Sequence, residues 1–168
     1  GLDMGPTGKL LKPMGDLDFE EAVSVFREVA ETGAEQGADL ILIETMSDTY
    51  ELKAAVLAAK ESSSLPVFAT VIFDEKGKML TGGTPQTAIA LLEGLGVDAV
   101  GMNCGLGPVQ MKPLAAEFIK YASVPVIVNP NAGLPRSEGG RTVYDIGPDE
   151  FEQAMEEILD MGISVAGG

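Results

Sequence analysis

The sequence predicts an α/β fold in which parallel strands and helices alternate along the chain. Short apolar runs rich in β-branched residues recur through the 168 residues, and segments with helical spacing of apolar residues lie between them. The apolar runs are continuous rather than alternating, which is typical of parallel strands buried on both faces. Proline and glycine also stand where helices should begin and end. These three observations agree on one fold class.

The predicted strands are a leading stub and five full strands. Residues 1–8 look like the end of a strand and the loop that follows it. Each of the later runs is short and rich in Val, Ile, Leu or Ala, as buried parallel strands are. The full strands are predicted at Leu40–Ile43, Val67–Phe73, Ala99–Met102, Val124–Val128 and Ile163–Ala166.

Five helices are expected between these strands, because apolar residues recur there every three or four positions. The apolar stripes lie within residues 19–30, 52–59, 89–95, 111–119 and 151–159. Helix starts are indicated by the capping-box spacing of Asp48 and Glu51 and by two first-turn prolines, Pro85 and Pro148. Helix ends are expected at three glycines, which are Gly33, Gly96 and Gly162.

Such alternation allows either a doubly wound sheet or a (β/α)8 TIM barrel. A doubly wound nucleotide-binding sheet usually carries a glycine fingerprint between a strand and the next helix, and no predicted strand here is followed by one. A complete barrel needs eight strands and about 250 residues. We therefore expect residues 1–168 to form a single partial TIM barrel domain of five βα units. It would cover the C-terminal part of the barrel and lack the first strands and the residues after the last strand.

Composition excludes several classes of function. The formal net charge of −15 argues against a nucleic-acid partner, which needs clustered Lys and Arg. Without histidine the chain contains no Ser-His-Asp or Cys-His arrangement, and a single cysteine rules out an internal disulfide. No apolar run is long enough to span a membrane, and there is no signal-peptide pattern. A cytoplasmic location is therefore the expectation.

The polar and glycine-rich strand ends are the most informative feature, because ligands bind at the carboxyl ends of parallel strands. Taken together and in order, these motifs resemble the homocysteine S-methyltransferase family across essentially the whole chain, most closely its cobalamin-dependent branch. The resemblance implies a (β/α)8 barrel that transfers a methyl group to the sulfur of homocysteine, giving methionine. The motifs are Gly5-Pro6-Thr7-Gly8, Glu44-Thr45, Asp74-Glu75-Lys76-Gly77 with Leu80-Thr81-Gly82, Asn103-Cys104 with Gly107-Pro108, and Pro130-Asn131-Ala132-Gly133.

A zinc site is implied by the resemblance, with Cys104 as the first of three cysteine ligands. A lone cysteine can otherwise be a small buried hydrophobe. The other two family cysteines follow a Gly-Gly pair at the last strand, and here Gly167-Gly168 ends the sequence. Bound zinc holds the substrate sulfur as thiolate near neutral pH, in the fourth position of a tetrahedral site. Since one thiolate should hold zinc only weakly, we expect this chain to be a fragment that is inactive alone.

The resemblance also implies four substrate-binding residues, and no residue is assigned a role as catalytic acid or base. Glu44 is expected to bind the homocysteine ammonium group, the alternative being a structural hydrogen bond to a neighbouring loop. Asp3 is expected to face the substrate at the preceding strand end. Asn103 either orients its loop or contacts substrate, and Asn131 either contacts a ligand or shapes a turn. Asp74 is expected to cap the turn that follows it.

Two kinds of methyl donor are compatible with the resemblance. In one, methylcobalamin recharged by methyltetrahydrofolate delivers the methyl group, and both are bound by other modules of the same parent protein. The Asp74–Gly82 stretch favours this form. In the other, a betaine- or S-methylmethionine-type small molecule is the donor.

Two hypotheses from other classes stay open. In a phosphate-binding barrel fragment, the Gly167-Gly168 segment would cradle a phosphate. Few basic residues lie near the strand ends, apart from Lys78 and Arg136, which counts against it. A non-catalytic hypothesis is that the open barrel associates with itself through the unpaired strands at its two edges.

Overall fold

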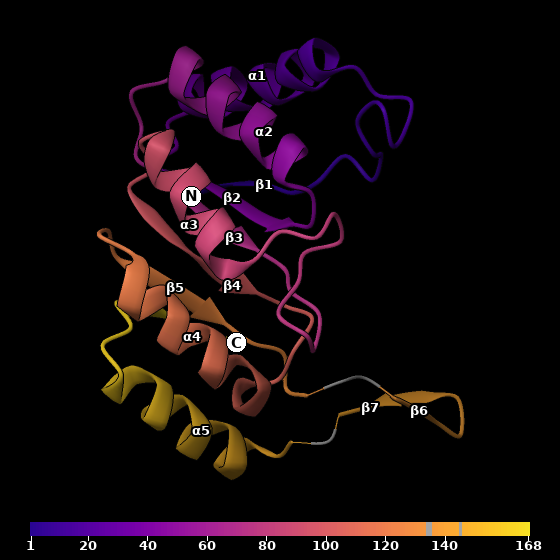
Figure 1. Cartoon of the computed structure of the whole chain (residues 1–168), viewed down its shortest axis with the longest axis vertical. Helices are drawn as coiled ribbons and strands as arrows, with labels where there is room; N and C mark the ends of the chain where they lie inside the picture. Colours follow the sequence, from indigo (N-terminus) through magenta and orange to yellow (C-terminus); the bar gives the residue numbers. More distant parts are fainter. Residues whose placement is uncertain (134–135, 145) are drawn as a thin grey trace.

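The computed structural model describes residues 1–133, 136–144 and 146–168, and it contains a six-stranded parallel sheet. Strands follow one another in the sheet in the same order as in the chain (Figure 1). The predicted α/β partial barrel is therefore confirmed, with the leading stub as its first strand. The strands are β1 (Leu2–Met4), β2 (Ile41–Met46), β3 (Val67–Val71), β4 (Ala99–Asn103), β5 (Val126–Asn129) and β8 (Val165–Ala166).

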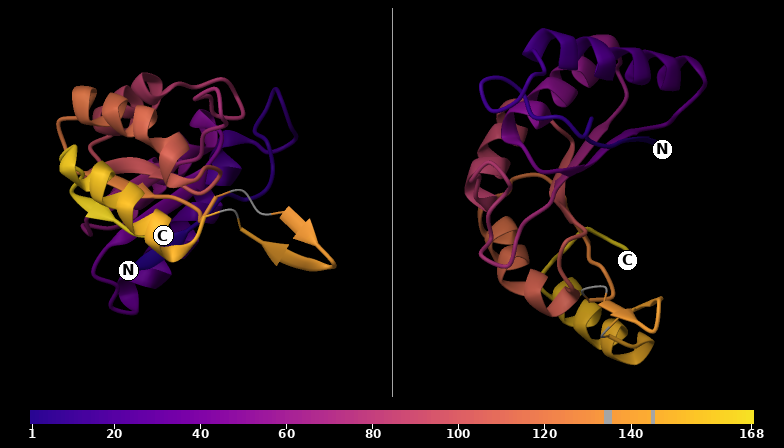
Figure 2. Two further views of the ribbon diagram at one scale, coloured as in Figure 1. Left: turned by 90° about the horizontal axis from the view of Figure 1, so that it is seen from below. Right: turned by 90° about the vertical axis from the view of Figure 1, so that its right-hand side faces the viewer.

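Helices cover one side of this sheet, and the molecule is a crescent with the helices on its convex side (Figure 2). Both chain termini lie on the concave side (Figure 2). In the described residues, no helix is long and apolar enough to cross a membrane. The helices are α1 (Phe19–Glu35), α2 (Thr49–Ser62), α3 (Pro85–Gly94), α4 (Pro108–Tyr121) and α5 (Pro148–Asp160).

The two faces of the sheet differ in burial. On β2, the outward side chains Ile41 and Ile43 are fully buried under the helices, whereas the inward Leu42 and Glu44 are half-buried. Phe68 on β3 is likewise half-buried on the inner face. The expectation of strands buried on both faces therefore holds for β4, in which every residue is buried, and is wrong for the inner face of β2 and for Phe68 of β3. Apolar runs indicate that a strand is central in a sheet, but they do not show whether both faces are covered.

Most predicted helix boundaries agree with the structure. Asp48 caps α2 by accepting a hydrogen bond from the backbone N of Tyr50, and Pro85 and Pro148 begin their helices. Gly96 and Gly162 follow the ends of α3 and α5 with φ of 76° and 101°. The capping box is only half formed, because Glu51 bonds Thr7 instead of the Asp48 backbone.

The predicted helix end at Gly33 is wrong, since α1 continues to Glu35. A Cβ built on Gly33 would lie 2.4 Å from a methyl carbon of Leu2. Glycine at this position therefore lets α1 approach β1 closely, and it does not stop the helix. Sequence alone does not distinguish these two uses of glycine near a helix end.

A two-stranded antiparallel hairpin, formed by β6 (Arg136–Glu138) and β7 (Arg141–Val143), lies between β5 and α5 in the chain. It projects away from the body of the crescent (Figure 1). Gly139 and Gly140 join its strands, both with positive φ. Gly-Gly is a common two-residue hairpin turn, but the flanking residues 136–138 and 141–143 carry too few apolar side chains to indicate strands.

Candidate functional site

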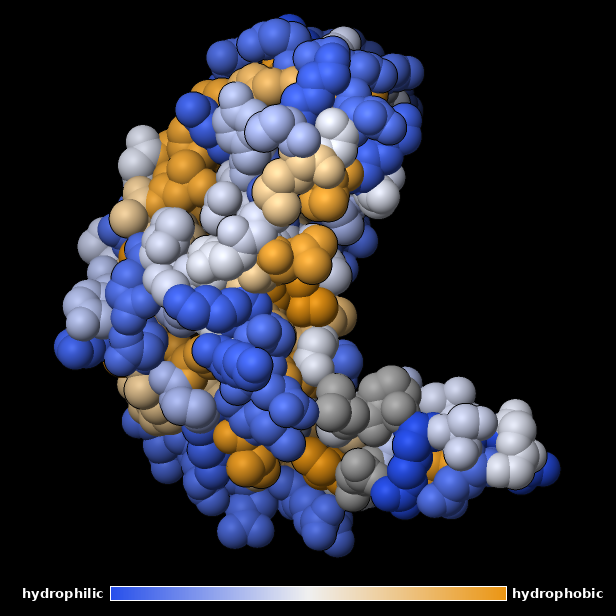
Figure 3. All heavy atoms as spheres, turned by 45° about the vertical axis from the view of Figure 1, so that its right-hand side comes forward, coloured by the Kyte–Doolittle hydropathy of each residue, from blue (hydrophilic) through white to orange (hydrophobic). Residues whose placement is uncertain are grey.

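The concave inner face of the sheet encloses a hollow of about 480 Å³. Part of its wall is apolar and includes Leu42, Phe68 and Ile127. Apolar atoms are visible in the middle of the concave side (Figure 3). Polar residues at or near the carboxyl ends of the strands also line it, namely Asp3, Glu44, Asn103 and Asn129. These four residues therefore gather around one hollow, whereas Cys104 does not line it.

A β-bulge at the end of β2 places two consecutive polar residues on this inner side. The pairing of β2 with β3 shifts between Ile43 and Met46, both of which are fully buried in the core. Glu44 lines the hollow, and the side chain of Thr45 bonds Asn103, which lines it too. Thr45 has a φ of 61°, a conformation that costs energy for a β-branched residue. Bulges of this kind re-aim side chains beside functional sites.

Asn103 is the centre of a buried hydrogen-bond network that joins three strands. Its side chain is on β4 and the residue is 2% exposed. Its Oδ1 accepts hydrogen bonds from the Thr45 backbone N at 2.9 Å and from Thr70 Oγ1 at 2.8 Å. Its Nδ2 donates to Thr45 Oγ1 at 2.6 Å and to Cys104 Sγ at 3.3 Å. The protein thus uses both donor hydrogens and both acceptor positions of the amide.

Cys104 lies directly after β4 and is half-buried. Its φ of 55° turns the chain sharply at the strand end, and its backbone N donates to the Asn129 carbonyl at 3.0 Å. The hydrogen bond from Asn103 reaches its sulfur. A partly exposed thiol that accepts one hydrogen bond from an amide is suitably placed to bind a metal or a substrate.

Glu44 and Asp3 face the same hollow, from neighbouring strands. Burial, and to a smaller extent the negative charge of Asp3, raises the pKa of Glu44 above its ordinary value of 4.5. Within the parts of the chain that the structure describes, neither carboxylate has a hydrogen-bond or ion-pair partner. Two neighbouring carboxylates without a cation form a site that favours a positively charged group.

Asn131 lies further out than the other three substrate candidates. Its backbone N donates to the Leu106 carbonyl at 3.0 Å, so it joins the loop after β5 to the loop that follows Cys104. It does not line the hollow, whereas Asn129, two residues earlier, does. Sequence reasoning did not select Asn129, although its place at the end of β5 was a usable signal. The substrate role of Asn131 stays a prediction.

The loop between β3 and α3 forms around Asp74, as expected. Oδ1 of Asp74 accepts hydrogen bonds from the backbone N atoms of Lys76 and Lys78, both at 2.9 Å. The same loop borders a second hollow, which Gly105 also lines, beside the thiol. Asp74 therefore shapes the loop that lies next to Cys104.

The described residues do not complete a metal site. Among them, no group of three or more Cys, Asp or Glu side chains could hold a metal ion. Cys104 has the right chemistry for a zinc ligand, because thiolates bind zinc well, but a tetrahedral site needs three protein ligands. The sequence thus supplies one thiolate for such a site.

The fold and this site define a (β/α) barrel protein with a thiol and a pair of carboxylates at the carboxyl ends of its strands. The sequence profile of the family described as "Homocysteine S-methyltransferase" matches residues 2–168. The chain belongs to this family. It is 37% identical over 171 aligned residues to proteins named methionine synthase from Mycobacterium leprae and Mycobacterium tuberculosis. The match covers 98% of this chain and 14% of the length of each relative.

Solved structures agree on the fold. The apo form of the homocysteine methyltransferase MmuM from Escherichia coli superposes with a TM-score of 0.76 at 20% identity, covering 99% of this chain and 55% of that one. Its metallated form gives 0.73 at 19% identity, covering 91% and 48%. The carboxyl transferase domain of Rhizobium etli pyruvate carboxylase gives 0.61 at 12% identity, covering 99% and 26%. The chain therefore has the architecture of part of a TIM barrel.

Proposed function

We propose that this chain is the homocysteine-binding part of an enzyme that methylates homocysteine to methionine. The observation that carries the proposal is the Asn103 side chain, which bonds both Cys104 and Thr45, the residue next to Glu44. The sulfur end and the ammonium end of an amino-acid thiol would thus be recognised by groups held in one network. Glu44 and Asp3 would bind the ammonium group, and the apolar wall would contact the carbon chain.

Cys104 would supply one thiolate of a zinc site in this proposal. When bound, zinc would keep the homocysteine sulfur deprotonated and nucleophilic near neutral pH. The two further thiolates would come from sequence outside these 168 residues, which contain one cysteine. Asn103 would orient the Cys104 sulfur through its hydrogen bond.

Methyl transfer by the full natural protein that carries these residues is the direct test. Purified protein is supplied with homocysteine and free methylcobalamin, and methionine formation is measured. We expect turnover in the wild type and its loss in Cys104→Ala. Ser123→Ala, which alters a contact with Glu93 on the opposite side of the fold, is the control and should stay active. A fully active Cys104→Ala protein would contradict the proposal.

Zinc titration of the 168-residue chain tests the incomplete site separately. We expect weak binding, since the single thiolate belongs to no cluster of three metal-ligating side chains among the described residues. Cys104→Ala should abolish even this binding. Tight binding of one equivalent of zinc to the monomer would show that the chain itself completes the site.

The methyl donor and the other partners belong to the same proposal. The 37% identity to methionine synthases favours methylcobalamin, with methyltetrahydrofolate as the source of the methyl group in other modules of the parent protein. Turnover with betaine or S-methylmethionine, and none with methylcobalamin, would favour the alternative donors. A cytoplasmic location, with neither nucleic acid nor a membrane as partner, remains the expectation.

Two earlier alternatives now differ in their support. The phosphate-binding hypothesis depended on Gly167 and Gly168. It loses support, because both residues lie within the family match over residues 2–168. Self-association keeps a structural basis, because β1 and β8 are the two edges of the sheet. Sedimentation of the isolated chain should then show dimers or larger species, and a monomer at all accessible concentrations would exclude it.

A further inference from the structure

Two buried carboxylates at the start of α2 bond two loops, one that follows the strand of Asp3 and one that borders the second hollow beside Gly105. Asp48 is 5% exposed and Glu51 is 2% exposed, although neither residue lines the hollow. Acidic groups this deeply buried need strong hydrogen bonds, and here the partners are hydroxyls and backbone N–H groups. Apart from the backbone N of Tyr50 in α2 itself, these partners belong to loops far away in sequence.

Glu51 holds the loop between β1 and α1, residues 5–18. Its Oε1 accepts hydrogen bonds from the Thr7 backbone N at 2.8 Å and from Thr7 Oγ1 at 2.5 Å. Lys9 donates its backbone N to the same Thr7 hydroxyl at 3.2 Å, which extends the connection into the loop. This loop begins just after Asp3, one of the two carboxylates proposed to bind the substrate ammonium group.

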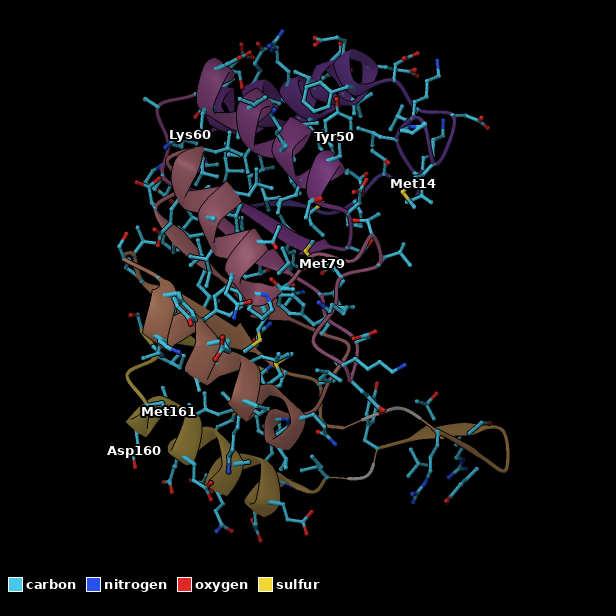
Figure 4. The ribbon with its side chains drawn as sticks, in the orientation of Figure 1. Met14, Tyr50, Lys60, Met79, Asp160 and Met161 are labelled. Carbon is cyan, nitrogen blue, oxygen red and sulfur yellow. The ribbon has the colours of Figure 1, made fainter. Side chains whose placement is uncertain are left out.

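Asp48 holds the loop between β3 and α3, residues 72–84. Its Oδ1 accepts a hydrogen bond from Thr81 Oγ1 at 3.1 Å while it also caps α2. Met14 of the first loop, Tyr50 at the start of α2 and Met79 of the second loop lie on the same side of the molecule (Figure 4). Lys60 and Asp160, near the ends of their helices, lie on the other side (Figure 4).

We propose that Glu51 and Asp48 are positioning residues for the homocysteine site. Their hydrogen-bond ties hold residues 5–18 (the Thr7 loop) and residues 72–84 (the Thr81 loop) at one rigid end of α2. The inference rests on the proposed function. Asp48 and Glu51 sit three positions apart, so a single turn of α2 presents one carboxylate to each loop. With the ties intact, Asp3 stays directed into the hollow, and the second loop keeps its place beside Gly105 and the thiol.

A second tie of the same kind, between Ser123 and Glu93, serves as a matched control. Ser123 donates its backbone N and its hydroxyl to the carboxylate of Glu93, at 2.5 Å and 2.9 Å. The arrangement repeats that of Thr7 on Glu51. It connects α3 to the segment before the amino end of β5, however, and so lies away from the carboxyl ends of the strands. Loss of this tie affects a loop without affecting the proposed substrate site.

Hydrogen exchange on the 168-residue chain tests whether the tie exists. We expect Glu51→Ala to lower the protection of the Thr7 amide by about tenfold or more. Glu51→Gln keeps a carbonyl oxygen that accepts both bonds and should retain protection. Unchanged protection in Glu51→Ala would overturn the proposal.

Steady-state kinetics of the full natural protein, with homocysteine and free methylcobalamin, test what the tie does. Glu51→Ala should raise KM for homocysteine several-fold and leave kcat within about twofold, because binding is impaired and the reacting groups are not. Glu51→Gln should restore KM, and Glu93→Ala should not change it. Lower kcat at unchanged KM, or no kinetic effect when the Thr7 amide is released, would overturn the positioning role.

The two experiments also separate this inference from the proposed function. If the wild-type protein methylates no homocysteine, the function fails, and with it the substrate assigned to the tie. If the wild type is active but Glu51→Ala behaves like Glu93→Ala in both measurements, only the positioning role fails.

Discussion

Polar residues of β4 and β2 line the same hollow, but one is fully hydrogen-bonded and the other is not. Asn103 on β4 is buried, and the protein satisfies all of its hydrogen-bonding groups. Glu44 on β2 is half-buried beside Asp3, and among the described residues it has no hydrogen-bond or ion-pair partner. The first group is organised for the protein's own structure. The second is left unneutralised, which is what a site for a cationic ligand requires.

Removal of the satisfied group should have the largest effect. Asn103→Ala leaves the Thr45 backbone N and the Thr70 hydroxyl without their buried acceptor, so we expect a loss of about 2–4 kcal/mol in the free energy of unfolding. Urea denaturation of the wild type and the variant measures this loss. Thr70→Val, which removes one of the four hydrogen bonds, should cost about 1 kcal/mol. A loss below that of Thr70→Val would show that the network is not a structural unit.

Removal of the unneutralised charge should instead affect binding. Glu44→Gln keeps the size of the side chain and removes its charge, so homocysteine affinity should fall by about tenfold, which corresponds to about 1.4 kcal/mol. Calorimetric titration of the full natural protein measures it. Asp3→Asn is the matched change on the exposed neighbour and should weaken binding less. An affinity unchanged in Glu44→Gln would remove this residue from the substrate site.

Glu44→Gln should also change the pH dependence of stability, with a sign set by the raised pKa of Glu44. Burial disfavours the ionised form in the folded state, so the stability that Glu44 contributes below its ordinary pKa of 4.5 is lost as pH rises through its folded pKa. The glutamine does not titrate. The Tm of the variant minus that of the wild type should therefore be more positive at pH 7 than at pH 4. The opposite trend would contradict the assigned cause.

Thr45, which lies between the two groups, should give the smallest effect and an unusual order of variants. Thr45→Gly removes a hydroxyl that accepts from Asn103, but it also relieves the left-handed strain. Thr45→Val loses the hydroxyl and keeps the strain. Val is ordinarily the better strand residue, yet here we expect the Gly variant to be more stable by about 1 kcal/mol. Thermal denaturation of both proteins decides the order.

Periodicity was sufficient to predict the parallel sheet, its five full strands and the βα alternation. It was sufficient because burial beneath helices forces apolar residues onto every strand. Cys104 directly follows β4, near the point where the apolar run stops, whereas Glu44 lies within β2, which continues three residues beyond its predicted end at Ile43. Their roles in binding stay predictions.

Features that depend on contacts between distant segments could not be predicted in the same way. The bulge at Thr45 needs the register of β2 against β3, which no pattern within one strand contains. Glu51 has the spacing of a capping box, but its actual partner, Thr7, is 44 positions away. Gly33 looks like a helix end until the position of Leu2 is known.

The order of the strands has a consequence for how the chain folds. In the main sheet each strand pairs only with the strands next to it in sequence, from β1 to β8. Each new βα unit therefore finds its partner in the unit just completed, across a single helix-containing connection. A chain emerging from the ribosome can add units one at a time, without waiting for a distant segment. Assembly can then proceed from the amino end to the carboxyl end, in the order of synthesis.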